Sequence, residues 1–172
     1  MNEDSKKLAI VTGAARGIGL ATALMFNENG YKVAIVDKDK KEIDNLSFEN
    51  KDIKKFCYDI SDNDNLDKMY SEILDWHNRV DVLVNNAGIA DFGPIEETNF
   101  KRWDEVMRTN LNGLFLCSQK AISNLKKTKG NIVNISSISG LRASTLRVAY
   151  GKSKAAVIQL TRQQAAELGE FG

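Results

Sequence analysis

The sequence contains few of the residues that build metal sites or disulfides. Among its 172 residues, two are cysteines, one is histidine and one is proline. Cys57 and Cys117 lie in apolar stretches without a paired ligand spacing, so we expect two reduced, buried thiols. His77 has no second histidine or Cys–His cluster to complete a metal site, and we expect it at the surface, near a helix end. We therefore predict no metal site.

Excess charge of one sign and long apolar runs are also missing. Twenty-four Lys and Arg oppose 23 Asp and Glu, which leaves a formal charge of +1 and no basic surface for nucleic acid. No apolar run approaches the length of a membrane span, and residues 1–7 are too polar for a leader peptide. We expect a cytoplasmic protein with no nucleic-acid or membrane partner, built as a single domain over 1–172.

Short apolar runs alternate with helical patterns along the chain. We expect strands at 8–11, 32–36, 56–58, 80–84 and 130–135, and helices at 17–29, from about 39, at 61–76 with Ser61 as its cap, at 100–125 and at 150–168. This alternation predicts an α/β fold with a doubly wound, Rossmann-like parallel sheet and helices on both faces. Gly13, Asp37, Asp59, Asn86 and Ser137 would then lie at the carboxyl ends of the strands, where such sheets bind ligands.

Glycines cluster between the first strand and the first helix, in the segment 12–19, which reads TGAARGIG. Glycine lets the backbone approach a pyrophosphate closely, and the N–H groups of the following helix stabilise its charge. The spacing G-x-x-x-G-x-G differs from the common G-x-G-x-x-G fingerprint, and a tight turn without a ligand is the alternative interpretation.

Asp37 ends the second strand at the spacing from the glycines that suits an acidic residue bound to ribose hydroxyls. A 2′-phosphate beside Asp37 would be repelled by roughly 4 kcal/mol for each pair of unit charges at about 4 Å. Arg16 could offset part of this repulsion. We therefore predict that NAD(H) is preferred and that NADP(H) is less favoured.

Tyr150 and Lys154 are four residues apart on a predicted helix, so the ammonium lies beside the phenol. A phenol needs a pKa shift of about three units, roughly 4 kcal/mol, to act as a base near neutral pH. A partly desolvated lysine can supply several kcal/mol of this preference, whereas a hydrated lysine supplies only about 1 kcal/mol. We predict Tyr150 as general acid/base, Lys154 as its electrostatic partner and Ser137 as the group that orients the substrate oxygen. The alternatives are a surface helix and a simple turn.

These features resemble the short-chain dehydrogenase/reductase family, in the family's order and over nearly the whole chain. The matching pieces are the segment 12–19, Asp37, Asp59-Ile60, the segment 85–88 (NNAG), Asn110, Ser137, Tyr150 and Lys154. The resemblance implies a catalytic tetrad of Asn110, Ser137, Tyr150 and Lys154, in which Lys154 also holds the nicotinamide ribose and Asn110 positions a water. By propensity alone, Asn110 inside a helix could equally be a solvated position.

The resemblance also implies the residues that bind the cofactor. They are Gly13, Ala15, Arg16, Gly17, Ile18, Gly19, Asp37, Asp59, Ile60, Asn86, Ala87, Gly88, Tyr150 and Lys154. Asp59 and Ile60 would contact adenine, and Asn85-Asn86 would tie the central strands together. Family members are commonly dimers or tetramers that pack on the helices corresponding to 100–125 and 150–168, which implies a homodimer or homotetramer.

Family members continue past the tyrosine helix with two further strands, a Pro-Gly turn and a substrate lid. This chain stops at Gly172, and its one proline is Pro94. We therefore expect a C-terminally truncated enzyme that lacks the final strands and leaves 131–135 as an apolar edge.

The function expected is an oxidoreductase that transfers a hydride between NAD(H) and a secondary alcohol or ketone as its small-molecule substrate. The alternatives are an NAD-binding fragment or regulatory module with little turnover, and an NADPH-dependent 3-oxoacyl carrier-protein reductase. Arg142 and Arg147 could meet an anionic substrate group, although solvated loop positions are the commoner role of such arginines.

Overall fold

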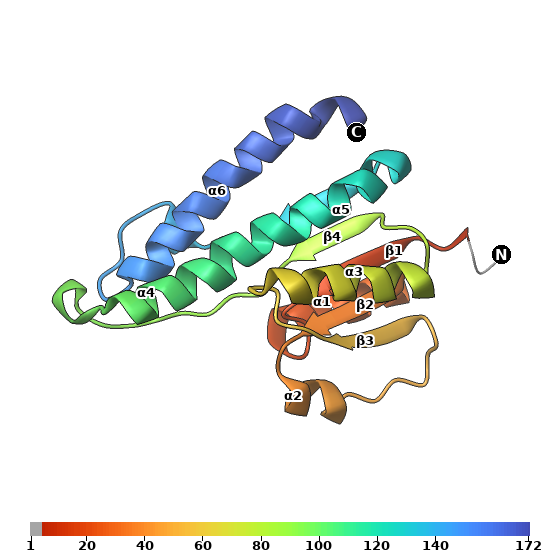
Figure 1. Cartoon of the computed structure of the whole chain (residues 1–172), viewed down its shortest axis with the longest axis horizontal. Helices are drawn as coiled ribbons and strands as arrows, with labels where there is room; N and C mark the ends of the chain where they lie inside the picture. The colour runs from red at the N-terminus through yellow and green to blue at the C-terminus, as the bar shows by residue number, and fades with distance from the viewer. Residues whose placement is uncertain (1–4) are drawn as a thin grey trace.

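The computed structural model describes residues 5–172 as a five-stranded parallel sheet in the order β3-β2-β1-β4-β5 (Figure 1). The strands are β1 (Leu8–Thr12), β2 (Lys32–Asp37), β3 (Ile53–Cys57), β4 (Val82–Asn85) and β5 (Asn131–Asn134). The first four residues of the polar start 1–7 lie outside the described residues. The predicted doubly wound α/β fold is confirmed.

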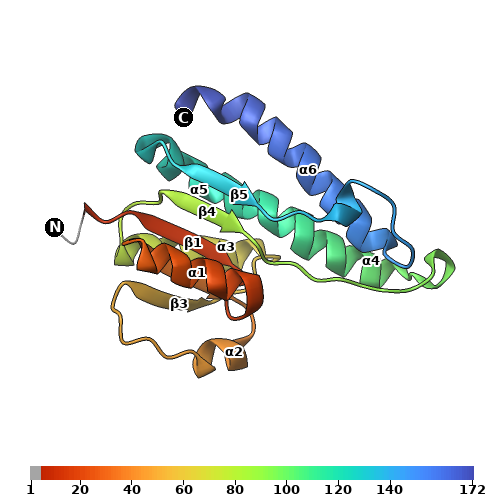
Figure 2. The ribbon, with the colours of Figure 1, turned by 180° about the vertical axis from the view of Figure 1, so that it is seen from behind.

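Helices cover both faces of this sheet. They are α1 (Gly17–Glu28), α2 (Lys40–Asn45), α3 (Asn63–Trp76), α4 (Phe100–Met107), α5 (Leu114–Thr128) and α6 (Val148–Leu168). Helices α3 and α5 lie on one face and α1 on the other, as the two opposite views show (Figures 1 and 2). No helix within residues 5–172 is long and apolar enough to cross a membrane.

The central strand β1 explains why the strands read as continuous apolar runs. Its alternate residues point to opposite faces, so Leu8 and Ile10 pack in the core with α3 and α5. Ala9 and Val11 pack in the core with α1. Because both faces are covered, every residue of the strand is buried. Strand β5 forms one edge of the sheet and is half-exposed.

The long helix expected at 100–125 is present, but a π-helical segment at Arg108–Gly113 lies within it, between α4 and α5. Two tertiary contacts hold this segment. Asn110 hydrogen-bonds to the backbone of Ile89, and Gly113 approaches Ile60 so closely that a β-carbon there would lie 2.9 Å from the Ile60 carbonyl oxygen. Such single-turn π segments are frequent at functional sites.

Four smaller expectations are also corrected. Asp62, not Ser61, caps α3 by accepting backbone hydrogen bonds from Asp64 and Asn65. Strand β3 begins and ends earlier than the predicted 56–58. Cys117 is buried as expected, whereas Cys57 is exposed because it alternates outward at the end of β3. His77 is buried, since its ring Nε2 lies 2.7 Å from the Lys6 carbonyl oxygen.

Candidate active site

A cavity of about 360 Å³ opens at the carboxyl ends of the strands, where the sheet topology predicts a ligand. It is lined by most of the expected cofactor residues, namely Gly13, Arg16, Ile18, Gly19, Asp37, Asp59, Ile60, Asn86, Ala87 and Gly88. Four expected cofactor residues are not among the lining residues: Ala15 in the glycine loop, Gly17 at the start of α1, and Tyr150 and Lys154 on α6. Ile60 is nearly fully buried and belongs to the core packed under α3 and α5, so little of its side chain reaches the cavity.

The glycine loop is fastened to the segment that follows β4. The Asn86 amide donates to the carbonyl oxygens of Thr12 and Gly13, both at 3.0 Å. The Thr12 hydroxyl accepts from the backbone N–H groups of Asn86 and Ala87, both at 3.1 Å. Gly13 has φ +62°, and a β-carbon on it would lie 2.6 Å from the Ala87 Cα, so a side chain is excluded there.

Asp37 ties the end of β2 to the same loop. Its carboxylate accepts from the N–H of Ala15 at 3.1 Å and from the N–H of Asp39 at 3.0 Å. A carboxylate has about four acceptor positions, so two backbone hydrogen bonds leave capacity for ribose hydroxyls. The loop, the start of α1 and this carboxylate therefore fit a dinucleotide cofactor.

Cations also border this cavity. Lys38 pairs with Asp59 at 3.3 Å, and the exposed Arg16 reaches Glu42 only at 4.0 Å. Burial alone would raise the pKa of Asp59. Hydrogen bonds from Ser61 and the nearby Lys38 ammonium outweigh burial and hold that pKa below its ordinary value. Asp59 is therefore ionised at neutral pH.

Asn110 is fully buried and connects three parts of the site. Its Oδ1 accepts from the Ile89 N–H and its Nδ2 donates to the Ile89 carbonyl oxygen, both at 2.8 Å. Nδ2 also donates to the Ser153 hydroxyl at 3.0 Å. Ser153 in turn donates to the Tyr150 carbonyl oxygen at 2.8 Å. The π-helical segment is thus joined to the first two turns of α6.

Lys154 is buried beside the same group. Its Nζ donates to the Ile135 carbonyl oxygen at 2.7 Å and lies 5.9 Å from the centre of the Tyr150 ring. A β-carbon on Gly88 would lie 3.3 Å from Asn110 Oδ1 and 3.5 Å from Lys154 Nζ, so these residues meet at one point. Burial lowers the pKa of Lys154. This is the partly desolvated ammonium that a proton-transferring phenol needs.

Ser137 is placed by the chain between β5 and α6. It caps a short 3₁₀ turn, η4 (Ile138–Gly140), and its Oγ accepts from the Ser139 N–H at 3.2 Å. The neighbouring Ser136 hydroxyl donates to the Lys154 carbonyl oxygen at 2.8 Å, which brings η4 onto α6. The structure therefore gathers all four predicted tetrad residues around the start of α6.

Sequence reasoning assigned no role to Thr12 or Ser153. Thr12 belongs to the glycine-rich segment 12–19, but its hydrogen bonds go to groups from a distant segment, as do those of Ser153. Sequence reasoning also did not foresee that the Arg147 guanidinium lies 4.9 Å from the centre of the Phe92 ring. Arg147 and Arg142 are both exposed on the loop before α6.

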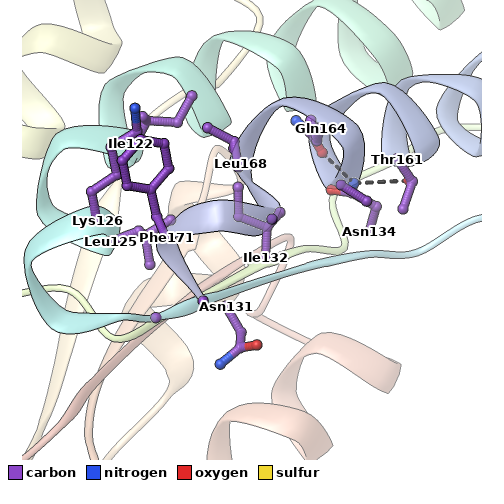
Figure 3. Close-up of a pocket in the computed structure, with 14 residues that line it drawn as sticks. Ile122, Leu125, Lys126, Asn131, Ile132, Asn134, Thr161, Gln164, Leu168 and Phe171 are labelled. Carbon is purple, nitrogen blue, oxygen red and sulfur yellow. Dashed lines mark hydrogen bonds between the residues drawn. The ribbon is translucent and has the colours of Figure 1, made fainter.

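A second cavity, of about 290 Å³, lies away from these residues, between β5 and the C-terminal halves of α5 and α6 (Figure 3). Asn134 reaches across it to Thr161 and Gln164 (Figure 3), and Phe171 closes one side. None of the predicted site residues lines it. Within residues 5–172, no group of three or more metal-binding side chains occurs.

The sequence matches the family profile described as short chain dehydrogenase over residues 7–172. The 3-oxoacyl-(acyl-carrier-protein) reductase FabG of Staphylococcus epidermidis is 38% identical, over 96% of this chain and 70% of the relative. The meso-2,3-butanediol dehydrogenase of Serratia marcescens is 35% identical, over 96% of this chain and 67% of the relative.

Solved structures agree with these relatives. A short-chain dehydrogenase from Streptomyces avermitilis superposes with a TM-score of 0.92 at 30% identity, over 98% of this chain and 62% of that one. ElxO with NADP bound superposes with a TM-score of 0.90 at 34% identity, over 97% of this chain and 70% of that one. This chain thus spans about two thirds of the length of these proteins. Its fold and profile show that the chain belongs to the short chain dehydrogenase family of NAD(P)-dependent oxidoreductases.

Proposed function

We propose that this protein transfers a hydride between NAD(H) and a secondary alcohol or ketone, with Tyr150 as general acid/base. The observation that carries the proposal is the buried Lys154 ammonium, which lies four residues from Tyr150 on α6 and faces Gly88, as Asn110 does. A positive charge that is shielded from water favours the phenolate of a nearby tyrosine.

In the reducing direction, the Tyr150 hydroxyl gives its proton to the substrate oxygen as that oxygen gains charge. The Ser137 hydroxyl donates a hydrogen bond to the same oxygen, since its Oγ already accepts from the Ser139 N–H and its own proton is free for the substrate. Lys154 stabilises the phenolate that remains. The nicotinamide supplies the hydride when the cofactor is bound.

In this proposal Asn110 does not contact the substrate. It helps to position α6 and lies near Lys154. It fixes the Ile89 backbone on one side and Ser153 on the other, so the first two turns of α6 keep their place. In the family's scheme Asn110 also positions a water for proton relay, and its approach to Lys154 across Gly88 supports that role.

NAD(H) is the cofactor that we propose, because Asp37 keeps free acceptor positions beside the glycine loop. NADP(H) is the alternative: Arg16 and Lys38 border the same cavity, and ElxO holds NADP. Titration of the protein with NADH and with NADPH, followed by the fluorescence of the reduced nicotinamide, decides between them. Tighter binding of NADPH than of NADH would contradict the proposed preference. Asp37→Ser is expected to reduce the preference for NADH over NADPH.

A second candidate reaction comes from the relatives. FabG of Staphylococcus epidermidis is named for the reduction of 3-oxoacyl groups, and the Serratia marcescens protein for 2,3-butanediol. A panel of 3-oxoacyl thioesters and short hydroxy ketones, assayed with both cofactors, identifies the substrate class. NADH binding without turnover of any of these compounds would favour a binding module instead.

We propose a homodimer or homotetramer that forms through residues 100–125 and 150–168. An open groove between α5 and α6 supports this, since it is lined by the exposed Phe115 and by the half-buried Leu111, Leu116 and Leu160. Light scattering during size exclusion tests it, and Phe115→Glu is expected to shift the protein to monomer. A single domain over 1–172 and a cytoplasmic location stay predictions.

A further inference from the structure

Two glycines lie at the contact between η4 and α6. The chain after β5 runs beside the first half of α6 (Figure 2). A β-carbon on Gly140 would lie 2.7 Å from the Lys154 carbonyl carbon and 2.8 Å from the Ala155 nitrogen. Real β-carbons do not approach backbone atoms so closely, so the contact requires glycine at position 140.

The second glycine belongs to the helix. A β-carbon on Gly151 would lie 3.1 Å from the Ser139 carbonyl oxygen, which is tight but can be relieved by a small shift of η4. The Ser136 hydroxyl adds a hydrogen bond to the Lys154 carbonyl oxygen at 2.8 Å. Backbone of η4, just after Ser137, is therefore in direct contact with backbone of α6, just after Tyr150.

This contact bears on the two groups that would touch the substrate oxygen. Ser137 is the cap of η4, and its Oγ is held by the N–H of Ser139, one residue before Gly140. Tyr150 precedes Gly151 on the helix. A change in the separation of η4 and α6 therefore moves the Ser137 hydroxyl relative to the Tyr150 phenol.

We propose that Gly140 and Gly151 are positioning residues, which set the separation between the Ser137 hydroxyl and the Tyr150 phenol by allowing backbone contact between η4 and α6. The inference rests on the proposed function, in which both groups act on one oxygen atom. Neither glycine touches cofactor or substrate in this scheme. Misplacement of a reacting group by about 1 Å can cost roughly a hundredfold in rate.

Alanine substitutions test the proposal, with Gly169→Ala as the matched control because a β-carbon there meets nothing within 4 Å. Gly140→Ala is expected to lower kcat roughly tenfold to a hundredfold while the dissociation constant of NADH stays unchanged. Gly151→Ala is expected to lower kcat less. Its Tm should stay the same or rise, because alanine favours a helix more than glycine does. A rate that falls while stability does not is the signature of positioning.

A kcat equal to that of the wild type in both Gly151→Ala and Gly140→Ala would overturn the proposal. So would a fall in kcat that occurs only in variants whose Tm or NADH affinity has also fallen. If Gly140→Ala fails to fold, Gly151→Ala alone decides. Crystal structures of the wild type and the variants provide a readout without turnover, namely the distance from Ser137 Oγ to Tyr150 Oη. An unchanged distance in the variants refutes the idea. If the wild type binds NADH but reduces no ketone, the proposed function fails, and this distance still tests the positioning.

Discussion

The Asn110 amide and the Ser153 hydroxyl are 3.0 Å apart and both are buried, so the π-helical segment before α5 is hydrogen-bonded to the N-terminal end of α6, which carries Tyr150. The two residues belong to elements that are far apart in the sequence. The bond, together with the two from Asn110 to Ile89, uses both N–H donors of this side chain and one of the two acceptor positions of its Oδ1. The π-helical segment thus lets one asparagine hold three segments at once.

Asn110→Ala is expected to lower the free energy of unfolding, because it removes the hydrogen-bond partner of the half-buried N–H and carbonyl of Ile89. A fully buried group left without a partner costs about 1–3 kcal/mol, and a half-buried group costs less because water reaches it. Urea unfolding measures the loss. The matched control is Asn112→Ala, in the same segment but exposed, which should change stability little. Equal effects of the two substitutions would show that the hydrogen bonds of Asn110 contribute nothing.

Lys154→Met is expected to change how stability depends on pH. Burial lowers the pKa of Lys154 in the folded state below its ordinary value of 10.5. Between those two pKa values the unfolded chain binds more protons, so the contribution of Lys154 to stability rises with pH. The contribution of Lys154 to the free energy of unfolding is least favourable near neutral pH, and it becomes more favourable as the pH approaches 10.5.

Urea unfolding of wild type and Lys154→Met from about pH 7 upward measures this trend. The wild type should gain stability relative to the variant over that range. A difference between the two proteins that does not vary with pH would mean that the ammonium is hydrated rather than buried.

Tyr58 is expected to ionise late. Its hydroxyl donates to Glu72 at 2.6 Å, and this hydrogen bond, with smaller contributions from burial and charge, raises the pKa of Tyr58 to about 12. NMR titration of labelled tyrosine, assigned with Tyr58→Phe, measures the value. Glu72→Gln removes the negative charge and should lower the pKa toward the ordinary 10.0. If the substitution leaves the titration unchanged, the pair does not form in solution.

The sequence predicted the fold and most of the residues that line the cavity at the strand ends, because these depend on local patterns. Apolar strands, the glycine loop and Asp37 each carry their signal within a few residues, and Gly13 and Asp37 lie where expected. The proximity of Tyr150 and Lys154 on α6 was predicted for the same reason, since residues four apart on a helix lie next to each other on one face.

Features that depend on distant partners could not be predicted. The π-helical segment is held by the hydrogen bonds of Asn110 to the backbone of Ile89. Helical periodicity in the sequence does not indicate these bonds. His77 is buried because the Lys6 carbonyl lies against its ring, at a separation of 71 residues. The close contact of Gly140 with α6 is likewise visible only in three dimensions.

The central claim is that Tyr150 moves a proton while NADH reduces a ketone. The most direct test is the rate of NADH oxidation by the wild type and by Tyr150→Phe across hydroxy ketones and 3-oxoacyl thioesters. The account predicts ketone-dependent oxidation in the wild type and a loss of roughly a hundredfold or more in Tyr150→Phe, with NADH binding retained. Oxidation at the wild-type rate by Tyr150→Phe would contradict it.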